Sequence, residues 1–150
     1  MEYHIARVQP EDWRLLRDVR LRALADTPDA FATTLAEDEA RPDDQWQARV
    51  GDSKVAQFLA TTDNHQSVGM VVGAPFRGEE NTAGLFGMWV APEARGCGIG
   101  TALVKAVVQW ARDESYQRIL LHVGDANVAA IRLYEACGLT ANGRPDTLPQ

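Results

Sequence analysis

Residues 88–103 restrict the fold most, because they join a strand pattern to a helix pattern through a glycine-rich turn. Ala83–Val90 is mostly apolar, as in a buried strand, and apolar residues recur at helical spacing from about Gly98 to Asp113. Three glycines lie at the junction: Gly96, Gly98 and Gly100. Glycine lets a backbone approach a ligand closely, and the first N–H groups of a helix attract an anion. The segment therefore predicts a pyrophosphate cradle, with the permanent charge of Arg95 at its rim.

Two common phosphate-binding loops do not fit this spacing. A Walker A loop ends in Gly-Lys-Ser or Gly-Lys-Thr, and no lysine directly follows these glycines. A Rossmann loop has the pattern G-x-G-x-x-G after the first strand of its unit. Here single residues separate the glycines, and they follow the fourth expected strand.

The rest of the chain reads as a mixed α/β domain that occupies residues 1–150 without a linker or repeat. Strands are expected at 3–8, 55–62, 67–74, 83–90 and 118–123, with the start of another at 139–142. Helices are expected at 10–25, 30–40, 43–50, 98–113 and 127–136. The helix between the strands at 83–90 and 118–123 predicts a parallel crossover.

Two motifs resemble those of the GNAT acetyltransferases. Arg95, Gly98 and Gly100 match the fixed positions of R/Q-x-x-G-x-G/A. Residues 123–139 resemble V-x-x-x-N-x-x-A-x-x-L-Y-E-x-x-G-F, with Leu139 in place of phenylalanine. The N-terminal third matches the family only in the order of its elements. The resemblance implies a mostly antiparallel sheet with a central, splayed parallel pair of strands, flanked by helices.

The resemblance also implies acetyl-CoA as co-substrate and no metal. Its cofactor core would span about residues 83–139, and the acceptor side about residues 10–50. The implied cofactor-binding residues are Trp89, Val90, Arg95, Gly96, Cys97, Gly98, Gly100, Thr101, Asn127 and Ala130.

Tyr134 is the catalytic residue that the resemblance implies, as the acid that protonates the departing CoA thiolate. A backbone N–H near a bulge at Met88–Val90 would stabilise the oxyanion. The general base stays open, because the strand at 83–90 has no carboxylate. The candidates are His122, Glu79, Glu80, Glu37, Asp38, a water chain, or an amine that is already neutral.

Each of these residues also has a simpler interpretation. Tyr134 would serve as a core aromatic, Asn127 as a helix N-cap, and Arg95 as a solvated charge. Cys97 reads as an incidental thiol, since no histidine is near it in sequence. Phe31 reads first as a packing residue, although the family's acceptor pocket would give a place to both Phe31 and Trp89.

Composition excludes several classes of function. The net charge of −6 lacks the basic face of a nucleic-acid binder, and no apolar run approaches a membrane span. The two cysteines have neither zinc-ligand spacing nor the number needed for a disulfide scaffold. With no leader pattern at Met1, we expect a cytoplasmic protein.

The C-terminal segment 144–150 does not read as a strand, although relatives usually end with one. We therefore expect the last strand to be missing and the exposed edge to permit a homodimer. The leading function is N-acetylation of a primary amine on a small molecule. The alternatives are a protein lysine or N-terminal acetyltransferase, and a CoA-binding regulatory module without catalysis.

Overall fold

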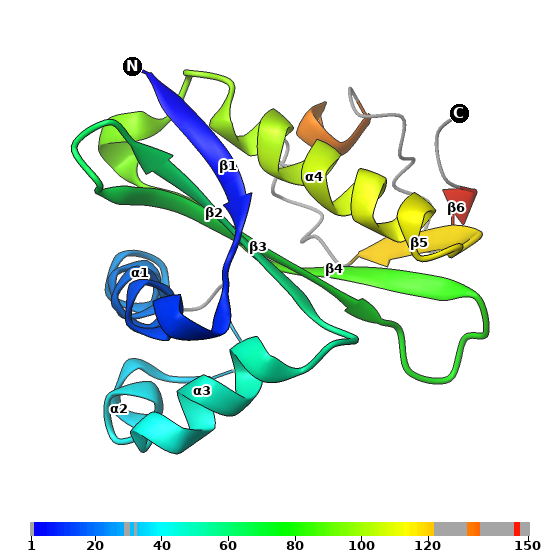
Figure 1. The fold of residues 1–150 in the computed structure, drawn as a ribbon. Helices are drawn as coiled ribbons and strands as arrows, with labels where there is room; N and C mark the ends of the chain where they lie inside the picture. The colour runs from blue at the N-terminus through cyan, green and yellow to red at the C-terminus, as the bar shows by residue number, and fades with distance from the viewer. Residues whose placement is uncertain (1, 29–30, 32, 122–131, 136–145, 148–150) are drawn as a thin grey trace.

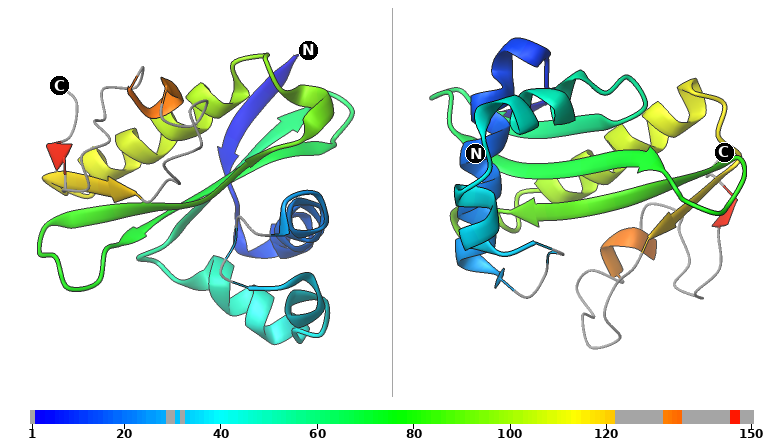
Figure 2. Two further views of the ribbon diagram at one scale, coloured as in Figure 1. Left: turned by 180° about the vertical axis from the view of Figure 1, so that it is seen from behind. Right: turned by 90° about the horizontal axis from the view of Figure 1, so that it is seen from below.

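A computed structural model describes residues 2–28, 31, 33–121, 132–135 and 146–147 of the chain. Its centre is a sheet of six strands in the order β1-β2-β3-β4-β5-β6. The strands are β1 (Tyr3–Arg7), β2 (Ala56–Thr62), β3 (Ser67–Pro75), β4 (Thr82–Val90), β5 (Arg118–Leu121) and β6 (Asp146–Thr147). The α-helices are α1 (Trp13–Asp26), α2 (Leu35–Glu39), α3 (Asp43–Gly51) and α4 (Ile99–Asp113). Helices α1, α2 and α3 lie on one face of the sheet and α4 on the other (Figures 1 and 2).

The sheet is antiparallel throughout except at β4 and β5, which run parallel. Helix α4 makes the crossover between these two strands, as the sequence predicts. The parallel pairing runs from Thr82 opposite Arg118 to Leu85 opposite Leu121, whereas β4 continues to Val90. The predicted fold class is therefore confirmed.

The ring of Trp110 on α4 packs directly against the backbone of β3, where the strand has a glycine. A Cβ added at Gly73 would fall 2.7 Å from the ring of Trp110. Leu103, Val104 and Val107 on the same helix have no exposed surface. Burial of each such side chain contributes about 1.5–3 kcal/mol to the stability of the fold. This buried face therefore anchors α4, whose first turn follows the glycine loop.

Strand β4 contains a bulge in its second half. Val72 of β3 pairs with Phe86, and Met70 pairs with Trp89, so three residue steps on β4 face two on β3. Gly87 occupies the bulge with φ of 60°, a left-handed conformation that costs most residues energy. The resemblance implied a bulge near Met88–Val90, and the observed bulge, between Phe86 and Trp89, overlaps the start of that range.

Helix α2 is shorter than the sequence indicates. A helix was expected over 30–40, but α2 begins at Leu35. The hydroxyl of Thr34 accepts the N–H of Glu37 at 3.1 Å, and Thr34 itself is extended. This cap fixes the start of the helix five residues later than expected.

The expectation of a missing last strand needs correction. Asp146 and Thr147 form β6, which pairs antiparallel with Ile119 and Arg118 of β5. An edge pairing needs few residues, and the prolines at 145 and 149 restrict it, because proline cannot donate a ladder hydrogen bond. Two residues give almost no strand pattern in sequence. The strand predicted to begin at 139–142 lies outside the described residues.

Candidate functional site

The glycine loop lies between the end of β4 and the start of α4. A short 3-10 turn, Pro92–Ala94, follows β4, and the chain then reverses at Gly96 and Gly98. Both glycines have φ near 80° (82° and 83°), a conformation that residues with a Cβ rarely adopt. No atom lies within 4 Å of a Cβ added at Gly96. The backbone here is open to a ligand from outside.

The amides of this loop are available as hydrogen-bond donors. The first helical bond of α4 runs from the N–H of Ala102 to the carbonyl of Gly98, at 3.1 Å. Within the described residues, no backbone carbonyl accepts from the amides of residues 96–101. Unpaired N–H groups and the positive end of the helix dipole together suit an anion such as pyrophosphate. The cradle predicted from the sequence therefore fits the group that it was expected to hold.

Arg95 begins the glycine loop, and its side chain is held by hydrogen bonds to the protein although it is half exposed. Its Nε donates to the carbonyl of Val90 at 3.0 Å, and its Nη2 pairs with Asp26 at 2.8 Å. The indole of Trp89 donates to the same Asp26 oxygen at 2.9 Å. The hydrogen bond from Trp89, followed by that from Arg95, holds the pKa of Asp26 below its usual value.

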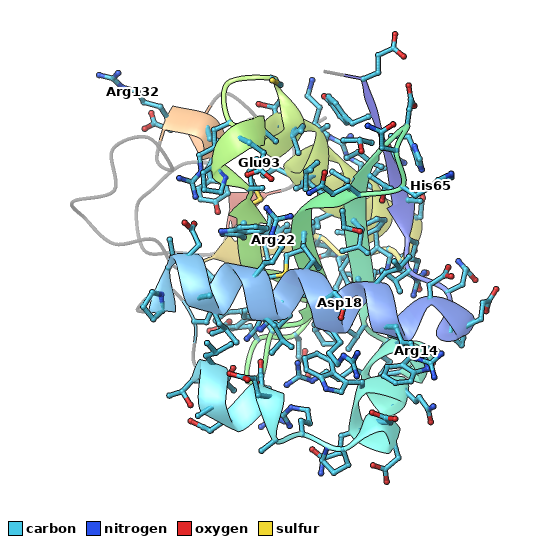
Figure 3. All side chains as sticks on the ribbon, turned by 90° about the vertical axis from the view of Figure 1, so that its left-hand side faces the viewer. Arg14, Asp18, Arg22, His65, Glu93 and Arg132 are labelled. Atoms are coloured by element: carbon cyan, nitrogen blue, oxygen red, sulfur yellow. The ribbon has the colours of Figure 1, made fainter. Side chains whose placement is uncertain are left out.

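A second link joins α1 to the loop. Arg22 pairs with Glu93 at 2.6 Å, and both side chains lie between α1 and the glycine loop in Figure 3. Arg22 also donates to the carbonyl of Ser67 at 3.2 Å and lies over the ring of Trp89. The end of α1 therefore holds the loop in place. No local pattern in the sequence predicts this link. Trp89 packs in the core, with 4% of its surface exposed.

Tyr134 lies on a helical turn, residues 132–135, close to the start of α4 (Figure 1). A Cβ added at Gly100 would meet the side chains of Leu133 and Met88, each at 3.1 Å. The turn that carries Tyr134, the first turn of α4 and the bulged strand therefore meet at Gly100. Tyr134 is 8% exposed and belongs to the core cluster.

The other predicted cofactor residues fall into two groups. Cys97 and Thr101 are on the loop and on the first turn of α4, with Cys97 exposed. Asn127 and Ala130 lie outside the described residues, as does His122.

Their positions argue against the four carboxylates that were candidates for the general base. Glu79 and Glu80 precede β4, which begins at Thr82. The bulge at Gly87 is five residues beyond Thr82, or about 16 Å along the strand. Glu37 is exposed on α2. Asp38 is fully buried and bound by two arginines. A general base must lie within hydrogen-bond reach of the reacting amine, and none of these four carboxylates lines the wall formed by Phe86 and Gly87.

A cavity of about 320 Å³ opens between α1, α3 and the sheet, on the face of the sheet opposite α4. Phe86 and Gly87 of the bulged strand form part of its wall, with Arg20 of α1 and Arg49 of α3. Phe86 is 40% exposed and stacks on Phe76, with ring centroids 6.2 Å apart. Sequence reasoning missed Phe86, because an aromatic residue in a strand reads as core.

Asp38 organises the charges around this cavity. Its carboxylate accepts from Arg20 at 3.3 Å, from Arg41 at 2.9 Å and from the hydroxyl of Thr33 at 3.1 Å. Burial by itself would raise the pKa of Asp38, but these hydrogen bonds and charges hold it below the usual value. A carboxylate with a lowered pKa and three donors is a poor base and a strong structural anchor.

The Asp38→Asn variant should lower the free energy of unfolding by about 3 kcal/mol, because Arg20 and Arg41 lose their shared anion. Asp38 has a lower pKa folded than unfolded, so it stabilises the protein above its unfolded value of about 4. That contribution disappears as the pH falls through the folded pKa. Urea unfolding at several pH values measures both effects. Glu39→Gln, an exposed change on the same helix, is the control; equal stability of the two variants at pH 7 would contradict the prediction.

Comparison with known proteins decides the family. The family model described as "Acetyltransferase (GNAT) family" matches residues 20–139. This chain belongs to the GNAT acetyltransferase family. A mycothiol acetyltransferase of Thermobispora bispora is 33% identical over 127 residues, which cover 79% of this chain and 40% of that protein. The chain thus spans about 40% of the length of the curated relatives that it matches first.

Solved structures support the GNAT fold. An aminoglycoside acetyltransferase, HMB0005, from an uncultured soil metagenomic sample has a TM-score of 0.76 and 18% identity, covering 100% of this chain and 99% of its own. A structure of AAC(6′)-Iy with the bisubstrate analog CoA-S-monomethyl-acetylneamine has a TM-score of 0.72 and 16% identity, covering 100% and 98%. At these identities the likeness establishes the fold alone.

Within the described residues, no three His, Cys, Asp or Glu side chains gather as metal ligands would. None of the helices in that part of the chain has the length and apolar character needed to cross a bilayer.

Proposed function

We propose that this GNAT protein transfers the acetyl group of acetyl-CoA to a primary amine of a small molecule. The observation that carries the proposal is the open cradle at Gly96–Gly98, placed directly after a strand that bulges at Gly87. The cofactor side then comprises about residues 83–139 and the acceptor side about residues 10–50. Acetyl-CoA supplies an activated thioester to this site.

The chain's own groups would divide the work as follows. The amides of the loop and of the first turn of α4 bind the pyrophosphate, and the backbone of Trp89 and Val90 orients the pantetheine arm. A bulge N–H stabilises the developing oxyanion. The C–N bond forms first, as the neutral amine adds to the thioester carbonyl. The C–S bond then breaks while Tyr134 donates its hydroxyl proton to the departing thiolate, and the proton that the amine nitrogen loses passes through solvent, which restores the Tyr134 hydroxyl. Arg95, tied to Asp26 and to the carbonyl of Val90, holds the loop in shape.

The cavity beside the bulge favours a small acceptor over a protein. Its volume of about 320 Å³ lies at the lower end of the range for small-molecule sites. Its wall combines apolar side chains with a few polar ones, as such sites do.

Turnover tests the proposal directly. The purified chain is incubated with acetyl-CoA and a panel of amines, and the products are identified by mass spectrometry. We expect an acetylated small amine together with free CoA in equal amounts. Acetylation confined to protein lysines or N-termini would instead favour the protein-directed alternative, and bound acetyl-CoA without any product would favour a regulatory module.

A further inference from the structure

The acceptor-side cavity has an excess of positive charge. Three arginines surround the single buried carboxylate of Asp38: Arg20, Arg41 and Arg49. Arg20 and Arg41 hydrogen-bond to that carboxylate at 3.3 and 2.9 Å, and Arg41 also donates to Gln45 at 3.0 Å. Their guanidinium groups therefore have protein partners.

Arg49 is different. Its guanidinium lies 4.8 Å from the centre of the Trp46 ring, but among the described residues it has no hydrogen bond and no ion pair. Burial, followed by the charge of Arg41, lowers its pKa, which reflects a half-buried cation beside other cations. The charge of Asp38 opposes this shift, but the hydrogen bonds of Asp38 go to Arg20 and Arg41. A half-buried cation without a hydrogen-bonded anion of its own favours the binding of an incoming anion.

The position of Arg49 connects it to the proposed reaction centre. Arg49 and Arg20 line the same cavity as Gly87. A Cβ added at Gly87 would lie 3.2 Å from Nη1 of Arg20, so the arginine side of the cavity touches the bulge. Asp52 also lines the cavity, but it is exposed and accepts the N–H of Lys54 at 3.0 Å. Arg20, Arg41 and Arg49 together carry three positive charges, and Asp38 and Asp52 carry two negative ones, so one positive charge remains beside the cavity.

We propose that the acceptor amine carries a small oxyanion, most simply the carboxylate of an amino acid, and that Arg49 binds this group. The proposal rests on the proposed acetyl transfer and names its substrate class. The planar guanidinium of Arg49 matches two carboxylate oxygens, or two phosphate oxygens, through paired N–H donors. Arg20, held by Asp38, adds charge without leaving its partner. The amine is then held beside the bulge by the anion that it carries.

The test compares matched substrates and matched variants. Wild-type protein with acetyl-CoA is assayed on amino acids, on their carboxamides, on aminoalkylphosphonates and on a polyamine. Hydrogen bonds to charged groups contribute enough for about a 10- to 100-fold preference for the carboxylate over the carboxamide. Arg49→Gln should remove most of that preference by raising KM for the carboxylate far more than KM for the carboxamide. Arg49→Lys should restore part of it.

Controls separate this effect from loss of structure. Arg112→Gln removes an exposed arginine from the last turn of α4, on the other face of the sheet. It should leave the acetylation rates of the carboxylate and the carboxamide as they are in the wild type. Thermal unfolding and acetyl-CoA binding of Arg49→Gln report on its fold. A preference for phosphonates over carboxylates would identify a phosphate-type anion at the same arginine.

The failures are also distinct. If the folded Arg49→Gln variant loses activity equally on carboxylate and carboxamide, or if the wild type prefers the polyamine, the carboxylate-binding role is wrong and acetyl transfer stands. If the wild type acetylates none of the amines, the proposed function fails, and the inference fails with it.

Discussion

Tyr134→Phe is expected to lower kcat by about 10²- to 10⁴-fold, because the variant loses the proton that we assign to the departing thiolate. KM for acetyl-CoA should change little, since the ring stays in place. Tyr134 is 8% exposed, so the phenylalanine ring fills the same buried volume. Steady-state release of free thiol, followed with a thiol reagent, measures the effect.

A second tyrosine provides the matched control for this change. Tyr116 follows the far end of α4 and packs on Trp110, with ring centroids 5.4 Å apart. Tyr116→Phe should retain full kcat. A Tyr134→Phe enzyme as fast as the parent would show that another group, or water, protonates the thiolate.

Gly98→Glu is expected to weaken acetyl-CoA binding by about 100-fold or more, which corresponds to about 2.7 kcal/mol. Gly98 caps α4 with φ of 83°, and any L-residue there is strained. The added carboxylate also stands among the amides that would receive the pyrophosphate, so like charges repel each other. Calorimetric titration of the variant measures the change in Kd.

Gly78→Glu is the control for Gly98→Glu. Gly78 has φ of 84° and open space around an added Cβ, but it lies in the loop between β3 and β4, at the opposite end of β4 from the glycine loop. It reproduces the backbone strain and the added charge without touching the cradle. Equal weakening in both variants would mean that general instability, and not the cradle, controls binding.

Local patterns predicted most of the fold. The periodicity of α4 and the apolar run of β4 gave elements whose observed bounds differ by only one residue from the expected ones. The glycine spacing predicted the cradle between them, and the structure gives Gly96 and Gly98 a left-handed backbone there. These features depend on residues that are neighbours in sequence, so local sequence patterns are enough to predict them.

The features that the sequence did not predict depend on distant residues. Asp26 joins Trp89 and Arg95 across more than sixty positions, and nothing near it in sequence indicates those partners. Asp38 appeared to be a candidate base until the structure placed Arg20 and Arg41 around it. The acceptor cavity arises in the same way, from helices and strands that meet only after folding.

Calorimetric titration of acetyl-CoA into the purified chain tests the central claim most directly. The account predicts saturable binding with one site per chain, together with an enthalpy signal that the Gly98→Glu variant loses and the Gly78→Glu variant keeps. Absence of binding to a folded wild-type chain would contradict the claim that the open amides of residues 96–101 receive a CoA pyrophosphate.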